Sequence, residues 1–167
     1  MSMVAGVLLI LAATLAQAAV LPEFSIFGVQ PNLLIVVLVA WLSVRSKQEA
    51  LPLIVIAGFS QGLLDSQPLG LAMLALAPLI VMSEVREWKL VESDLLPAIL
   101  LTVLATWAYE GVMLISLAVT GERVDWLSSL IDVLLPAAIA NALLLLPVYG
   151  VMRFFRPELR PSPAFGA

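Results

Sequence analysis

Six apolar stretches separated by short polar turns are the feature that most restricts the fold of this sequence. They cover residues 3–21, 31–44, 50–64, 69–82, 95–119 and 136–155. A helix of about 20 apolar residues can cross the hydrocarbon core of a bilayer. Because lipid offers no hydrogen-bond partners, a backbone that crosses it must satisfy its own polar groups, and helices do so. We therefore expect an all-α integral membrane protein, a bundle of six transmembrane helices.

The composition supports this class and excludes several others. Hydrophobic residues make up 62% of the chain and charged residues 12%, with a mean hydropathy of +1.10. A soluble domain is roughly half apolar and a quarter charged. We expect one transmembrane domain over residues 1–157 and a short cytoplasmic tail over 158–167. The eight basic residues are too scattered for a nucleic-acid surface. Cysteine and histidine are absent, which excludes disulfides and the usual zinc sites.

The basic residues predict how the chain is oriented. Seven of the eight follow the second, fourth or sixth apolar stretch, and only Arg123 lies in a turn of the opposite side. By the positive-inside rule both termini are cytoplasmic. Ala16-Gln17-Ala18 resembles a signal-peptidase site, but no Lys or Arg precedes the first apolar core, so we expect an uncleaved helix. The stretches at 50–64 and 69–82 are short, and a re-entrant pair remains open for them.

The turn between these two short stretches reads GFSQGLLDSQPLG. Gly58 and Gly62 are four residues apart, and such a strip of small residues lets two helices approach closely. Asp65, Pro68 and Gly70 supply turn chemistry between two helices. A helical hairpin is the simplest interpretation, with the strip packed inside the chain or against a partner helix.

Glu110 is the one acidic residue deep within an apolar stretch. A charge there is expensive, so the side chain should face protein or water rather than lipid. It shares a helix face with Thr102 and Thr106. The functional interpretations are a ligand-binding carboxylate, a proton-coupling group or a link to a partner helix. The structural interpretation is an internal link to Gln61, Asn141 or a backbone carbonyl.

Asn141 lies between Pro136 and Pro147 in the last stretch. The prolines free backbone carbonyls, and the Asn141 amide could satisfy one of them. We expect the last helix to start at Pro136, after a short entry helix. No Ser-His-Asp set, phosphate-binding glycine loop or metal cluster is present in the sequence. We therefore expect no enzyme, no catalytic residue, no metal and no cofactor.

Three stretches together resemble the MreD family of rod-shape-determining membrane proteins. They are PNLLIVVLVA at 31–40, GFSQGLLDSQPLGLAML at 58–74 and LPAAIANALLLLPVYGVMRFFR at 135–156. The resemblance covers nearly the whole chain through the order and spacing of its motifs. Two features depart from the family pattern: Asn32 replaces an acidic residue, and the segment 84–94 is acidic.

The resemblance implies a non-enzymatic scaffold subunit of the elongasome, the bacterial machine that builds side-wall peptidoglycan, in the inner membrane. Implied partners are a bitopic MreC-like protein and, through it, a RodA-like glycosyltransferase, a class B penicillin-binding transpeptidase and cytoskeletal MreB. The family fold is thought similar to S components of energy-coupling-factor transporters, so a vitamin-binding subunit is the alternative. Its low aromatic content, 7%, favours the scaffold. A proton-coupled transporter using Glu110 is a third interpretation.

Overall fold

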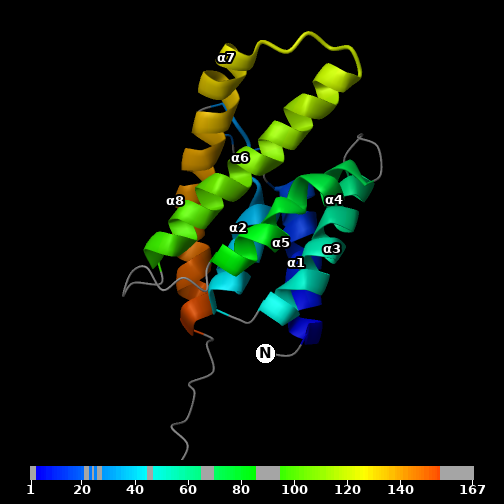
Figure 1. Cartoon of the computed structure of the whole chain (residues 1–167). Helices are drawn as coiled ribbons and strands as arrows, with labels where there is room; N and C mark the ends of the chain where they lie inside the picture. The colour runs from blue at the N-terminus through cyan, green and yellow to red at the C-terminus, as the bar shows by residue number, and fades with distance from the viewer. Residues whose placement is uncertain are drawn as a thin grey trace, which may run out of the picture.

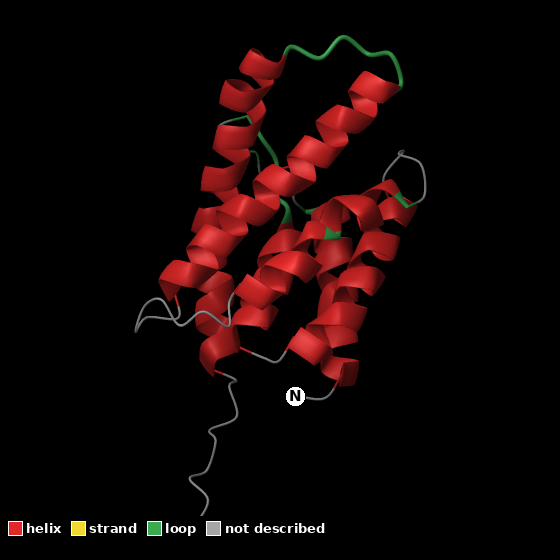
Figure 2. Cartoon of the chain, viewed as in Figure 1, coloured by secondary structure: helices red, strands yellow, loops and turns green. Residues whose placement is uncertain are grey.

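The computed structural model describes residues 3–20, 23, 25, 28–44, 47–64, 70–85 and 95–154. Within these ranges every secondary-structure element is helical, as predicted (Figure 2). The elements are α1 (Met3–Ala19), α2 (Leu33–Val44), α3 (Lys47–Leu64), α4 (Leu71–Leu76), α5 (Pro78–Val85), α6 (Leu95–Val119), α7 (Trp126–Ser129), the π-helical turn η2 (Leu130–Leu134) and α8 (Leu135–Phe154).

Two helices are long and apolar enough to cross a membrane, judged by length and composition. The first is α6, with 25 residues, and the second is the continuous helix formed by α7, η2 and α8, with 29 residues. At 1.5 Å per residue they extend about 37 and 43 Å. Four shorter apolar helices, at Met3–Ala19, Leu33–Val44, Ala50–Leu63 and Leu71–Met82, account for the other predicted stretches.

Helix α2 lies at the centre of the packing. Ten of its twelve residues, Leu34 to Ser43, are buried, and α1, α3, α6 and α8 all pack against it. Its sequence, LLIVVLVAWLSV, is apolar on every face, which is typical of a helix surrounded by others. The main core contains most of its side chains together with residues of α1, α3, α4, α5, α6 and α8.

The last helix, α8, begins at Leu135, within one residue of the predicted start, and the predicted short helix before it is α7. No break separates the two, because α7 continues through η2 into α8. In η2 the Leu135 N–H donates to the carbonyl of Leu130, five residues back. This wide turn comes directly before Pro136, which has no amide hydrogen to donate. Asp132 lies within this continuous helix and is exposed.

The fourth apolar stretch forms two helices rather than one. The Ala77 N–H donates to the carbonyl of Leu74 at 3.2 Å, a bond three residues back that tightens the turn. Pro78 then begins α5, and its ring cannot supply the amide bond that would continue α4. Helices α3 and α4 pack against each other, so the hairpin predicted around residues 58–70 is present (Figure 1).

Candidate functional site

Polar side chains meet at the start of α2, where a buried helix exposes amides that need partners. The Asn32 side chain accepts a hydrogen bond from the Ile35 N–H at 3.1 Å, which caps the helix. On α1, the Oε1 atom of Gln17 accepts from the Leu34 N–H at 3.3 Å. Asn32, the residue after Pro31, is therefore the cap, and α2 begins at Leu33. Side chains of the protein, rather than water, are therefore the hydrogen-bond partners of these first amides of α2.

Asn141 joins this end of α2 to α6 and α8. Its Oδ1 atom accepts from the backbone N–H of Asn32 at 2.7 Å. Its Nδ2 atom donates to Oγ1 of Thr106 at 2.9 Å, and Thr106 donates to the Thr102 carbonyl at 2.8 Å. The orientation of the amide follows from the first bond, because a backbone N–H can only donate. Asn141 therefore has the structural role predicted for it, but its partners are not carbonyls freed by proline.

Of the three residues predicted to share a polar face of α6, Thr102 and Thr106 are buried and hydrogen-bonded. Thr102 and Thr106 are both fully buried, and Thr102 donates to the Ala98 carbonyl at 2.9 Å. These local bonds satisfy the hydroxyls without help from other helices. Thr106 retains an acceptor position, which Asn141 fills. Thr106 and Asn32 are thus members of the network that sequence reasoning did not assign as partners of Asn141.

Glu110 lies one helical turn beyond Thr106 and is half-buried. Within the described part of the chain, its carboxyl group has no hydrogen-bond or ion-pair partner. The expected internal link to Asn141 is not formed, because Asn141 bonds to Thr106 and Asn32 instead. Gln61, the other predicted partner, is buried on α3. Glu110 thus continues the polar face of α6 one turn beyond Thr106.

The glycine strip of α3 packs inside the chain. A Cβ atom on Gly58 would lie 2.7 Å from Cα of Met73 on α4, so only glycine fits. Gly62 is also buried. Gly70 precedes α4 with a φ of 101°, a left-handed conformation that favours glycine. Asp65 and Pro68 lie outside the described residues.

The two predicted prolines of the last helix have different surroundings. Pro136 directly follows the π-helical turn and is half-buried. Pro147 lies inside α8 and is exposed. Neither lies in the hydrogen-bond network of Asn141.

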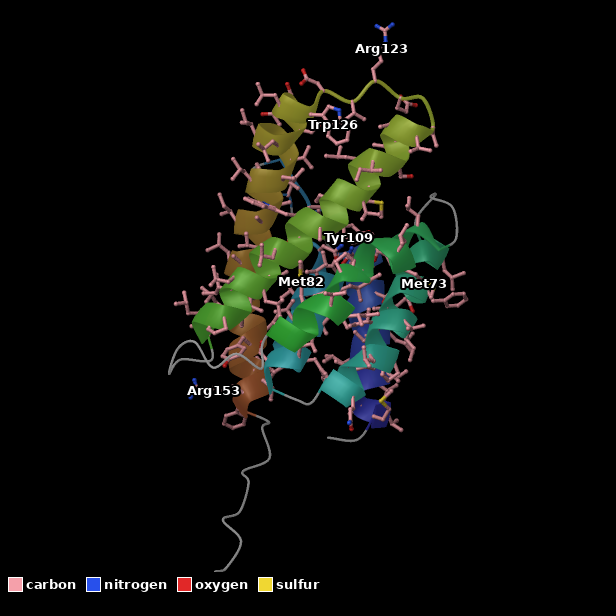
Figure 3. All side chains as sticks on the ribbon, viewed as in Figure 1. Met73, Met82, Tyr109, Arg123, Trp126 and Arg153 are labelled. Carbon is pink, nitrogen blue, oxygen red and sulfur yellow. The ribbon has the colours of Figure 1, made fainter. Side chains whose placement is uncertain are left out.

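Residues 110–136, which we call the α6–α7 hairpin, pack against the core through Val112 and Met113 and extend beyond the bundle toward the loop (Figure 1). None of them is buried. Helices α6 and α7 diverge toward the connecting loop, and Trp126 extends from α7 into the space beside α6 in the view of Figure 3. The large exposed apolar residues of this hairpin are Ile115, Leu117, Val119, Trp126, Leu127, Leu130, Ile131 and Leu135.

The tip of the α6–α7 hairpin is polar and ordered by local hydrogen bonds. Asp125 accepts from the Ser128 N–H at 3.3 Å and from the Ser128 hydroxyl at 3.1 Å, which caps α7. These bonds hold the pKa of the Asp125 carboxyl below its usual value. Gly121 has a φ of 91°, which allows the chain to turn after α6.

The described residues contain no cluster of His, Cys, Asp and Glu that could hold a metal ion. Comparisons with protein-family models, curated proteins and solved structures find no match to this chain. The candidate site is therefore defined by its own geometry: a buried polar network, a half-buried carboxyl group and an apolar hairpin beyond it.

Proposed function

We propose that this chain is a six-pass protein of the bacterial inner membrane with both termini in the cytoplasm. Its apolar helices alternate in direction, and α1 begins at the end of the bundle where α8 finishes (Figure 1). Arg123 and Arg153 lie at opposite ends (Figure 3). This arrangement supports the orientation derived from the basic residues. Of the shorter helices, α1 and α3 pack against α2, while α4 and α5 pack against α3 and α6.

Within that membrane we propose a non-enzymatic scaffold, an MreD-like subunit of the cell-elongation complex. The observation that carries the proposal is the α6–α7 hairpin, which exposes eight large apolar side chains and has no buried residue. Lipid alone could cover apolar side chains. It could not satisfy Glu110, because a carboxyl group facing hydrocarbon is expensive. A protein partner that supplies a hydrogen-bond donor would both cover the apolar side chains and pair with the Glu110 carboxyl group.

The occupant we propose is the single transmembrane helix of an MreC-like bitopic protein. Such a helix would lie along α6 and present a hydroxyl, amide or basic side chain to Glu110. Leu117 is seven residues beyond Glu110 and shares its helix face, so the partner would extend toward the loop. Through this partner the scaffold would join a RodA-like glycosyltransferase, a class B penicillin-binding transpeptidase and MreB.

Site-specific photo-crosslinking tests this proposal. A photoreactive amino acid is placed at Leu117 or Ile131 in the hairpin, or at Leu8 on α1 as a control that is also exposed. Each variant is expressed with the tagged MreC-like protein of the same genome. We expect crosslinks from the two hairpin positions and none from Leu8.

Two results would overturn the scaffold proposal. One is the absence of hairpin crosslinks in membranes that contain the bitopic protein; the other is equal crosslinking from Leu8. Co-purification of an energy-coupling-factor transporter module with a bound vitamin would instead support the alternative of an S-component-like subunit.

A further inference from the structure

Full burial stops at the same level on both helices that form the α6–α7 hairpin, and beyond it only Val112 and Met113 of the hairpin still pack against the core. The last buried residue of α6 is Tyr109, and the first buried residue of the other helix is Ala137. The hydrogen bond between Thr106 and Asn141 lies on the bundle side of both positions. Each helix therefore has a part buried in the bundle and a part that is half-buried or exposed.

The helix that contains α8 changes its backbone geometry at this level. The π-helical turn Leu130–Leu134 has a bond from the Leu135 N–H to the Leu130 carbonyl, and Pro136 follows with no amide hydrogen. The regular series of backbone hydrogen bonds between residues four apart is therefore interrupted here. Prolines and π-helical turns are the usual places where helices bend.

Gly111 lies opposite this interruption on α6. Thr106 faces Asn141 across a hydrogen bond of 2.9 Å. Because the two helices are antiparallel, moving five residues from each, about 7.5 Å at 1.5 Å per residue, pairs Gly111 with Pro136. A Cβ atom on Gly111 would meet no atom within 4 Å. Close packing therefore does not require glycine here, whereas local flexibility of the helix does use it.

We propose that residues 111–135 form a hinged unit. It pivots about Gly111 on α6 and about the π-helical turn with Pro136 on the other helix, while the bond between Thr106 and Asn141 holds the bundle below. Glu110 directly precedes the first pivot, so movement of the unit changes what surrounds its carboxyl group. This inference does not depend on the proposed partner, because it rests on contacts within the chain.

Distances between pairs of spin labels, measured by pulsed electron resonance in lipid nanodiscs, test the hinge. The sequence has no cysteine, so labelled cysteines can be introduced in pairs. Leu8 with Val119 joins the bundle to the hinged unit, Leu8 with Leu143 lies within the bundle, and Val119 with Leu127 lies within the unit. All four residues are exposed. We expect a broad distance distribution for the first pair and narrow ones for the other two.

Substitutions at the pivots give the decisive comparison. Gly111→Ala meets no steric obstacle and favours regular helix, so it should narrow the distribution of the Leu8–Val119 pair. Pro136→Ala restores an amide and should narrow it as well. Gly150→Ala is the matched control, since a Cβ atom there also meets nothing within 4 Å, and it should leave the width unchanged. The Leu8–Leu143 distance verifies that each variant is folded.

Either of two outcomes would overturn the hinge. A Leu8–Val119 distribution as narrow as those of the two control pairs would mean that the unit is rigid. A broad distribution that Gly111→Ala leaves unchanged, or that Gly150→Ala narrows equally, would place the movement elsewhere.

Discussion

Asn141 on α8 and Thr106 on α6 are joined by a hydrogen bond of 2.9 Å, although 35 positions separate them in the sequence. The other end of the Asn141 amide accepts from the Asn32 N–H at 2.7 Å. One side chain thus connects α2, α6 and α8 at a buried position. Such a satisfied polar group fixes how the three helices sit against one another.

We expect Asn141→Leu to lower the free energy of unfolding by about 1–3 kcal/mol, the cost of leaving a buried donor without a partner. The Asn32 N–H would lose its acceptor. Thermal or denaturant unfolding in mild detergent measures the change. Leu143→Ala, on an exposed position of the same helix, should have a much smaller effect. Equal stability of Asn141→Leu and the unmodified protein would contradict the proposed role of the network.

Sequence reasoning identified Asn141 but not its partners, and the reason is physical. Periodicity predicts which residues share a face of one helix, and it placed Thr102 and Thr106 together correctly. Which residue of α6 lies opposite Asn141 depends on how far the two helices slide along each other. That register is decided by packing of the whole bundle. The capping role of Asn32 was accessible, since an asparagine before an apolar run is a typical helix start.

Gly58→Ala should destabilise the isolated protein by about 1–3 kcal/mol, as overpacking usually does. The new Cβ atom would lie 2.7 Å from Cα of Met73, and backbone cannot move aside as a flexible side chain can. Gly150→Ala is the control, because its Cβ atom would have free space. Unfolding in detergent without any partner distinguishes the two. A Gly58→Ala protein that is stable alone but no longer binds a partner would contradict the internal packing.

The glycine spacing predicted a close approach of helices but left the neighbour open. The structure assigns the neighbour of Gly58 to α4 of the same chain. The helix boundaries were likewise predicted only in part from the sequence. The sequence-based range 95–119 matches α6, and α8 begins within one residue of Pro136, but the continuity of α7 with α8 was not predicted. A proline breaks an α-helix but is tolerated after a π-helical turn, and the apolar pattern does not reveal that turn.

Glu110→Leu should leave the unfolding free energy of the isolated protein within about 0.5 kcal/mol of its original value, as is usual away from specific contacts. The reason is that the described part of the chain offers its carboxyl group no partner. The same substitution should weaken co-purification of the MreC-like protein, while Glu110→Gln, which can still hydrogen-bond, should preserve it. A clear loss of stability of the isolated Glu110→Leu protein would instead indicate an internal link.

The proposed topology predicts opposite accessibility of the two ends of the bundle. Single cysteines replacing Glu122 and Arg153 can be labelled with a membrane-impermeant maleimide, since the chain has no cysteine of its own. In intact cells whose outer membrane has been made permeable, position 122 should react and position 153 should react only after lysis. The reverse pattern would invert the orientation. Equal labelling of both positions before lysis would contradict a membrane-spanning arrangement.

Asp125 should make the tip of the α6–α7 hairpin sensitive to acid. Its carboxylate accepts from the amide and the hydroxyl of Ser128, which lowers its pKa. The pKa of Asp125 is lower in the folded protein than in the unfolded one. The cap therefore contributes its full stabilisation at pH values above the ordinary pKa of an aspartate. Its contribution is lost as pH falls through the lowered folded value. At neutral pH the cap is complete.

The chemical shift of the Ser128 amide, followed by NMR from neutral to acidic pH, reports this cap. We expect a single transition below the usual range of an aspartate. Asp125→Asn should remove the transition but keep an acceptor oxygen, whereas Asp125→Ala should remove the cap at every pH and fray α7. A transition that persists in Asp125→Asn would have to come from another carboxyl group. Since α7 is one arm of the hinged unit, fraying it should also broaden the distribution of distances between labels at Val119 and Leu127. With the intact cap we expect this distribution to be narrow.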